Sequence, residues 1–203
     1  MASESAKPAI GAHARRAAGA GGAGSARPVT DLLPVVDEAD HGRQIRPAGV
    51  DVLEAGFPAA SEGDFEAVSS IAKKIKRMEV AGLARTSKED IDRAWVAVQH
   101  AVNPKIHTFI ATSDIHLEYK LKMTRDEVVK TAVEAVKYAT TLTDNVEFSA
   151  EDGSRSDRDF LCKVFEAVIE AGATTVNLPD TVGYAIPQEF SDLIGYVKAH
   201  TPN

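Results

Sequence analysis

From residue 50 onward, short apolar runs alternate with amphipathic stretches in units of about thirty residues. Each run has the length of a buried strand, and each following stretch places apolar residues on one face of a helix. This alternation is typical of parallel strands joined by crossover helices. The predicted strands are Val50–Ala55, Val80–Ala84, Ile106–Ala111, Val146–Ser149 and Thr174–Leu178.

Start and stop signals support the helical stretches. Ser87, Thr124 and Ser156 each precede an acidic residue by three positions, which is typical of a capped helix start. Pro187 suits a first helical turn, and Gly172 suits a helix end. The apolar faces of the five predicted helices begin near Phe65, Ile91, Val128, Phe160 and Phe190.

Polar residues follow every predicted strand at its C-terminal end, for example Glu54, Thr112, Glu151 and Asp180. An open doubly wound sheet concentrates its site at one switch point, whereas a barrel builds its site from many strands. We therefore predict an α/β fold, an incomplete (β/α)₈ TIM barrel, because a closed barrel takes eight units. In such a piece the strands at Val50 and Thr174 are expected to have unpaired edges, which favour self-association.

Residues 1–46 differ from the rest, being rich in Ala and Gly with several Arg residues. A segment so poor in large apolar groups is predicted to be a disordered tail, or alternatively a plastid transit peptide. Residues 47–203 form the predicted barrel domain. We expect a cytoplasmic protein, since the single cysteine, Cys162, fits a reducing compartment. The net charge of −7 disfavours nucleic-acid binding, and no apolar run is long enough to cross a membrane.

Five ordered stretches resemble the 2-isopropylmalate synthase family. They are Gly49–Ser61, Gly82–Arg85, Ile106–His116, Val146–Asp152 and Asn177–Gly183. The resemblance continues to Asn203 and matches strands 2 to 6 of that family's barrel. Homocitrate, citramalate and methylthioalkylmalate synthases share the barrel and the chemistry, and they remain alternatives.

The resemblance implies that acetyl-CoA condenses with 2-oxoisovalerate to give 2-isopropylmalate in leucine biosynthesis. It also implies a divalent metal (Mg, Mn or Zn) as a Lewis acid. Carried over by position, Glu151 becomes the catalytic carboxylate that handles protons, with Ser149 as its hydroxyl neighbour. Thr181 becomes the hydroxyl that holds the oxo-acid carboxylate.

Three more positions carry over from the resemblance. His107 and Leu83 line the substrate pocket, with Leu83 bounding the branched side chain, and Glu54 lies on the same rim. Each position has a structural alternative: a histidine at the edge of the core, a turn threonine, or rim carboxylates paired with Arg85 or Arg155.

The family's metal-binding motifs are missing from this sequence. No Arg-Asp-Gly occurs, and no two of the six histidines lie two residues apart. We therefore expect no metal ligands in this chain and no activity from it alone. Two hypotheses remain: a piece of a synthase that another segment or subunit completes, or a non-catalytic module that associates with a full-length synthase.

Overall fold

The computed structural model describes residues 9–10 and 50–201. Their strands form one parallel six-stranded sheet in the order β1-β6-β5-β4-β3-β2. Apart from β1, the strands therefore follow chain order, as they do in a barrel wall. The strands are β1 (Ala9–Ile10), β2 (Val52–Gly56), β3 (Glu79–Arg85), β4 (Asn103–Ala111), β5 (Val146–Glu151) and β6 (Thr175–Asn177).

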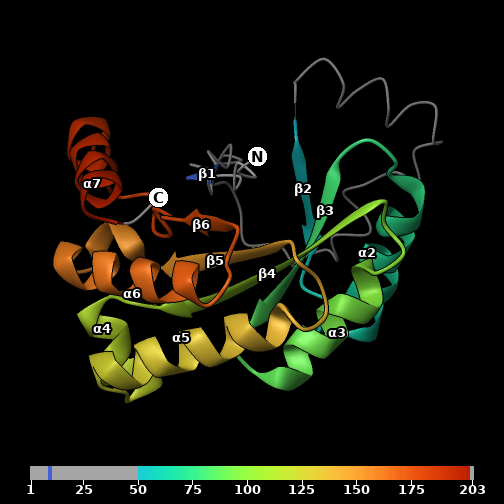
Figure 1. The fold of residues 1–203 in the computed structure, drawn as a ribbon, viewed down its shortest axis with the longest axis horizontal. Helices are drawn as coiled ribbons and strands as arrows, with labels where there is room; N and C mark the ends of the chain where they lie inside the picture. Colours follow the sequence, from blue (N-terminus) through green and yellow to red (C-terminus); the bar gives the residue numbers. More distant parts are fainter. Residues whose placement is uncertain (1–8, 11–49, 202–203) are drawn as a thin grey trace, which may run out of the picture.

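Helices α2, α3, α5 and α6 lie along one side of this sheet (Figure 1), and α7 packs beside α6. The helices are α2 (Glu62–Lys74), α3 (Lys88–Val98), α4 (Asp114–His116), α5 (Arg125–Ala139), α6 (Arg158–Glu170) and α7 (Pro187–His200). A π-helical turn, η3 (Leu117–Leu121), follows α4, and a 3₁₀ turn, η4 (Gly153–Arg155), follows β5.

The two faces of the sheet have different chemistry because side chains alternate along a strand. On the face toward the helices, Ile106 and Phe148 are fully buried in the main apolar core. Gly82 also lies on this face, where an added Cβ would stand 3.0 Å from Val98. The opposite face carries polar side chains such as His107 and Ser149, so the helices cover the apolar side and leave the polar side for a site.

All five predicted strands and all five predicted helices are present, and most of the capping predictions are confirmed. Thr124 and Glu127 form a complete capping box at the start of α5, and Ser87 accepts a hydrogen bond from the backbone of Asp90. The prediction for α6 is wrong: Asp157 caps this helix by accepting a hydrogen bond from Phe160. Ser156 instead bonds to Thr112 over 2.6 Å, a tertiary contact that local spacing does not reveal.

The predicted free edge at the strand near Thr174 is also wrong. Ala9 and Ile10 pair in parallel with Thr175 and Val176 of β6. These two residues belong to the Ala- and Gly-rich head, and the rest of that head lies outside the described residues. Among the described strands, β2 pairs only with β3.

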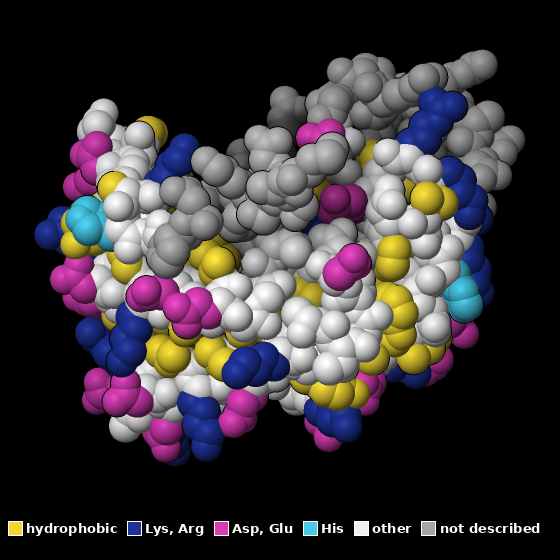
Figure 2. Space-filling view, in the orientation of Figure 1, with side chains coloured by type: hydrophobic (Ala, Val, Ile, Leu, Met, Phe, Trp, Pro, Cys, Tyr) yellow, Lys and Arg dark blue, Asp and Glu magenta, His cyan; other side chains and the backbone are white. Residues whose placement is uncertain are grey.

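The surface formed by α5 and α6 carries both acidic and basic side chains. Figure 2 shows acidic and basic side chains interspersed over the region of α5 and α6. Ion pairs such as Lys163–Asp126, at 2.7 Å, join these two helices. None of the helices in the described part of the chain has the length and apolar character needed to span a membrane.

Candidate functional site

A chain of polar side chains, buried except at its Glu54 end, crosses the sheet on the face opposite the helices. Glu54 of β2 contacts His107 Nδ1 of β4 through its carboxylate. His107 Nε2 lies 2.5 Å from Ser149 Oγ of β5, and Asn177 Nδ2 of β6 donates to the same oxygen over 2.8 Å. His107, Ser149 and Asn177 are all buried. Four strands therefore contribute to one hydrogen-bonded unit.

A second buried group lies beside this chain. The Lys105 ammonium is 2.9 Å from Glu79 and 3.6 Å from Glu147, which itself lies 3.8 Å from His107 Nε2. Burial raises the pKa of Glu79, but hydrogen bonds from Lys105 and Asn145 outweigh it, so the pKa is lowered overall. The interior of the sheet thus holds charges that compensate one another in part.

Glu151 occupies the C-terminal end of β5, on the rim. Its two carboxylate oxygens accept hydrogen bonds from Lys120 over 2.7 and 3.0 Å. The Glu151 side chain is 20% exposed, so it is the carboxylate of this strand that solvent reaches, whereas Glu147 is 2% exposed. This position suits a group that exchanges protons with a bound molecule.

Asp152 joins three rim loops. Its buried carboxylate accepts hydrogen bonds from Arg155 (2.7 and 2.8 Å) and from Ser113 (2.5 Å), and it lies 3.0 Å from His116 Nδ1. Its backbone N–H donates to Thr181 Oγ1 over 2.9 Å. Burial raises the pKa of Asp152, but the bonds from Arg155 and Ser113 outweigh it and hold the pKa below its ordinary value.

Sequence reasoning overlooked the role of Asp152. Asp152 adopts a left-handed backbone conformation with φ of 61°, which aspartate tolerates better than most residues. An acidic residue directly after a strand, followed by Gly153 and a nearby Arg155, was the available signal. His116 is also a member of this group.

The structure brings three of the predicted site residues into contact: Glu54, His107 and Ser149. Leu83 is half-buried and pairs in register with His107. Thr181 and Glu151 lie on the rim, linked through Asp152. The roles assigned to these residues stay predictions.

The alternative prediction, in which Glu54 and Glu151 pair with Arg85 or Arg155, is wrong because these arginines bind other carboxylates. Arg85 pairs with Asp90 at 2.6 Å and Arg155 pairs with Asp152. Glu54 contacts His107 and Glu151 contacts Lys120 instead.

The described residues do not provide a set of ligands for the divalent metal that the resemblance implies. Within residues 50–201 no group of three His, Cys, Asp or Glu side chains is arranged to hold an ion. The carboxylates of the site are engaged elsewhere, Glu54 with His107 and Glu151 with Lys120. Any ligands for such an ion would therefore include residues outside the described part of the chain.

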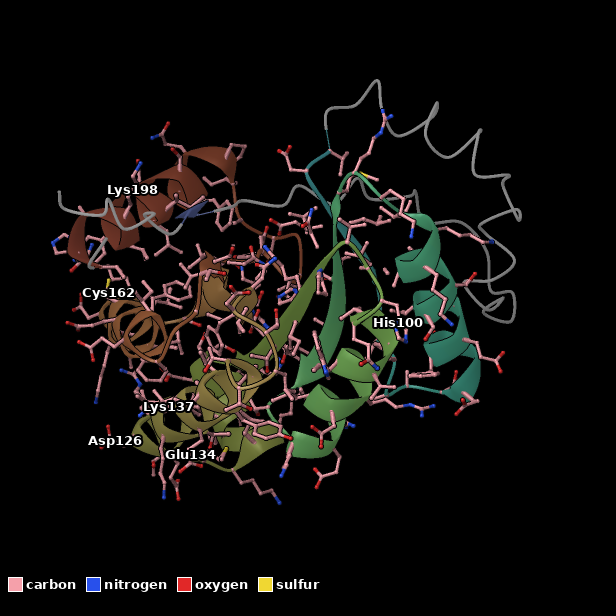
Figure 3. The ribbon with its side chains drawn as sticks, turned by 45° about the vertical axis from the view of Figure 1, so that its right-hand side comes forward. His100, Asp126, Glu134, Lys137, Cys162 and Lys198 are labelled. Carbon is pink, nitrogen blue, oxygen red and sulfur yellow. The ribbon has the colours of Figure 1, made fainter. Side chains whose placement is uncertain are left out.

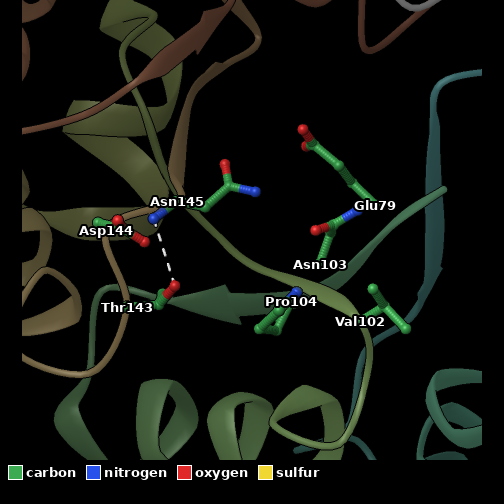
Figure 4. A pocket seen from close by; sticks show the side chains of 7 residues that line it. All are labelled: Glu79, Val102, Asn103, Pro104, Thr143, Asp144 and Asn145. Carbon is green, nitrogen blue, oxygen red and sulfur yellow. Dashed lines mark hydrogen bonds between the residues drawn. The ribbon is translucent and has the colours of Figure 1, made fainter. Parts of the chain in front are cut away.

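Two surface cavities lie away from this site. One, of about 320 Å³, lies at the N-terminal ends of the strands and is lined by Glu79, Pro104 and Asn145 among others (Figure 4). The other, of about 410 Å³, lies between α2 and α3 and includes His100. Figure 3 places His100 and Cys162 on opposite sides of the molecule. Barrel enzymes build their sites at the C-terminal ends of the strands, so neither cavity is the candidate site.

Comparison with known proteins assigns a family. The family model described as HMGL-like matches residues 39–203. The chain is 63% identical over 161 residues to the 2-isopropylmalate synthase of Nitratidesulfovibrio vulgaris and 59% identical over 161 residues to that of Syntrophus aciditrophicus. Each alignment covers 79% of this chain but only 31% of the relative. The chain therefore spans about a third of the length of these curated relatives.

A solved structure supports the fold. The crystal structure of the HMG-CoA lyase of Bacillus subtilis matches with a TM-score of 0.57 and 17% sequence identity. The match covers 82% of this chain and 59% of the lyase chain. The fold is that of a partial α/β barrel, as the alternation of strands and helices predicts.

Proposed function

Because the chain belongs to the HMGL-like family, we propose that it forms the central strands of a 2-isopropylmalate synthase barrel and takes part in that enzyme's reaction. Acetyl-CoA loses a methyl proton, the resulting carbanion bonds to the ketone carbon of 2-oxoisovalerate, and water cleaves the thioester to release CoA and 2-isopropylmalate. Two contacts in a chain 63% identical to such a synthase carry this proposal: His107 with Ser149 on the polar face of the sheet, and Asp152 with Thr181 where the loops after β5 and β6 meet.

The geometry of Thr181 supports a role in holding the oxo-acid carboxylate. Its Oγ1 accepts the backbone N–H of Asp152, so the hydroxyl hydrogen points away from that contact. The contact is rigid because Arg155 and Ser113 fix the buried Asp152 side chain. A hydroxyl whose oxygen is held in place and whose hydrogen remains available suits a carboxylate oxygen, which only accepts.

Glu151 is the group we propose for proton handling. Its carboxylate lies on the rim and is partly exposed, and the flexible Lys120 side chain holds it in place. A carboxylate in this position can accept a proton from bound acetyl-CoA and return it later in the reaction. Leu83, in register with His107, would lie beside the branched side chain of the oxo acid.

A chimaera tests the proposal because it supplies the rest of the enzyme. The matched segment of the Nitratidesulfovibrio vulgaris synthase is replaced by residues 50–201 of this chain. We expect CoA thiol release that requires both acetyl-CoA and 2-oxoisovalerate, and that falls at least about tenfold in the Glu151→Gln variant. A folded chimaera that releases no thiol above background contradicts the proposal.

The second candidate is a non-catalytic module that binds a full-length synthase or a second copy of this chain. The observation that favours it is the edge of β2, which has no further neighbour among the described strands. Co-purification of the tagged full chain with the intact synthase, in a stable complex, supports this candidate. Separate elution of the two proteins contradicts it.

A further inference from the structure

One edge of the sheet is formed by a segment that lies outside the family match. β6 (Thr175–Asn177) pairs with β5 on its inner side. On its outer side, Thr175 and Val176 pair with Ala9 and Ile10 of β1. The HMGL-like match begins at residue 39, so β1 comes before the matched region. The sheet therefore ends in a strand that the family barrel does not supply.

The place beside β6 is the one that a barrel wall gives to its next strand. In repeated βα units, each helix leads back by a right-handed crossover to a strand next to the preceding one. α7 follows β6 and packs against α6, as such a crossover helix does. In the described part of the chain no strand follows α7, and β1 occupies the place where that strand would pair. β1 and a further wall strand would thus compete for one edge.

The outer edge of β6 is suited to strand pairing. A strand carries backbone N–H and C=O groups along both of its sides, and an unpaired side is a template for another chain. The inner side of β6 is paired with β5, and β1 pairs with the outer side. Val176 and Leu178 are 1% and 5% exposed, so buried apolar groups flank this edge. Without β1, the outer side of β6 would be open to a second chain.

β1 is itself a poor template for further pairing. It has two residues, and short edge strands are one means by which proteins prevent edge-to-edge association. In the sequence, Pro8 precedes β1 and Gly11 follows it. Proline has no N–H to donate and glycine is disfavoured in strands, so the sequence opposes a longer strand in either direction. β1 therefore covers the edge of β6 without presenting an equivalent edge.

The strand that fits the β6 edge in place of β1 is β2 of a second copy. β2 (Val52–Gly56) lies at the opposite end of the same parallel sheet and pairs only with β3 among the described strands. Beside β6 of another copy, β2 would run in the same direction and continue the wall. This contact joins two different surfaces, so it is heterologous and can repeat from copy to copy.

We propose that the outer edge of β6 is an acceptor for β2 of a second copy, and that Ala9–Ile10 occupy this edge within the same chain and so limit assembly. With the edge occupied, two copies can meet through the described strands only at their β2 edges, which gives at most a dimer. With the edge free, copies associate through β6 and β2. This inference concerns assembly and does not depend on the proposed catalytic function.

Proline substitutions test the inference in the full chain. The double variant Ala9→Pro and Ile10→Pro, the β1 variant, removes both backbone N–H groups of β1. The double variant Ala17→Pro and Ala18→Pro, in the same Ala- and Gly-rich head, is the matched control. Hydrogen exchange with mass spectrometry follows β6 and β2 at low and high protein concentration, and light scattering gives the oligomeric state. Exchange in α5 and α6 checks that every variant is folded.

The expected results depend on protein concentration. In the parent chain and the control, the β6 amides should be protected at every concentration, and no species should exceed a dimer. In the β1 variant at low concentration, β6 should exchange at least about tenfold faster than in the parent. At high concentration the protection of β6 should return, because association is favoured by mass action. β2 should gain protection, and the mean mass should rise, over the same range.

Four results would overturn the inference. Equal β6 exchange in the parent and the β1 variant at low concentration shows that β1 does not cover the edge, and a control that behaves like the β1 variant shows the same. A β6 that stays unprotected at every concentration in the β1 variant shows that the edge accepts no second copy. Association without protection of β2 shows that another surface is the partner. The activity of the chimaera tests the proposed function separately.

Discussion

The backbone N–H of Asp152 donates to Thr181 Oγ1 over 2.9 Å, which ties the loop after β5 to the loop after β6. The Asp152 side chain extends the tie to the loop after β4 through Ser113 and His116. One buried carboxylate thus fixes three of the rim loops on which the proposed site depends.

Asp152→Asn tests this arrangement. The variant loses the charge that Arg155 and Ser113 bind, and we expect the free energy of unfolding to fall by about 1.5–3 kcal/mol. In the chimaera the KM for 2-oxoisovalerate should rise because the loop whose backbone N–H bonds to Thr181 is held less firmly. Chemical denaturation measures the first effect. A variant with unchanged stability contradicts the role given to Asp152.

The same carboxylate predicts a pH dependence of stability. The folded-state pKa of Asp152 is below its ordinary value of 3.8, because the bonds from Arg155 and Ser113 outweigh the effect of burial. Its stabilisation is therefore present above about pH 3.8 and is lost as pH falls through the folded-state pKa. Asp90, held by Arg85, should act in the same direction. Denaturation midpoints between pH 2 and 6 should decline less steeply for Asp152→Asn than for the parent chain.

Gly172 ends α6 with φ of 110°, a conformation that other residues rarely adopt. A Cβ added there would lie 2.9 Å from Thr140 Cγ2. We expect Gly172→Ala to destabilise the fold by about 1–3 kcal/mol. Gly195→Ala in α7 is the matched control: an added Cβ meets nothing within 4 Å, and alanine should stabilise that helix by up to about 1 kcal/mol. Equal melting temperatures for the two variants would disprove this account.

A contact is predictable from the sequence when its two residues are close together in the chain, and this decides which features of the fold were predicted. The capping box of Thr124 and Glu127 is predictable because it needs only residues three apart. The cap of α6 was not, because Ser156 is engaged by Thr112, which is distant in sequence. The pairing of β1 with β6 escaped prediction for a similar reason, since nothing in an Ala- and Gly-rich segment marks Ala9 and Ile10 as a strand.

The contacts of the candidate site were not predictable from the sequence. Family resemblance selected Glu54, His107 and Ser149, and the structure brings these three side chains into contact. That Glu54 contacts His107, 53 residues away, depends on strand register, which local patterns do not fix. Asp152 was not predicted as a site residue because its role depends on contacts with the loops after β4 and β6, which are distant in sequence.

The observed cap of α6 by Asp157, in place of the predicted Ser156, gives a further prediction. Asp157→Ala should cost about 1 kcal/mol because the N–H of Phe160 loses its acceptor. Thr124→Ala in α5, where the cap was predicted correctly, should cost a similar amount. Thermal melts of both variants test this, and a neutral Asp157→Ala would show that the cap contributes nothing.

The open edge of β2 predicts association. Only β3 pairs with it among the described strands, and exposed strand edges favour pairing with another chain. We expect the purified chain to self-associate or to bind a synthase. Size-exclusion chromatography with light scattering measures this, and a single species of 21.6 kDa would contradict the expectation.

The choice of oxo acid tests the central claim most directly. The chimaera is supplied with acetyl-CoA and, in turn, 2-oxoisovalerate, pyruvate or 2-oxoglutarate, and the products are identified by mass spectrometry. Our account predicts 2-isopropylmalate as the main product, with kcat/KM for 2-oxoisovalerate at least about tenfold above that for the other two acids, because we propose that Leu83 bounds the branched side chain. A preference for pyruvate or 2-oxoglutarate, in a chimaera that is folded and active, would contradict it.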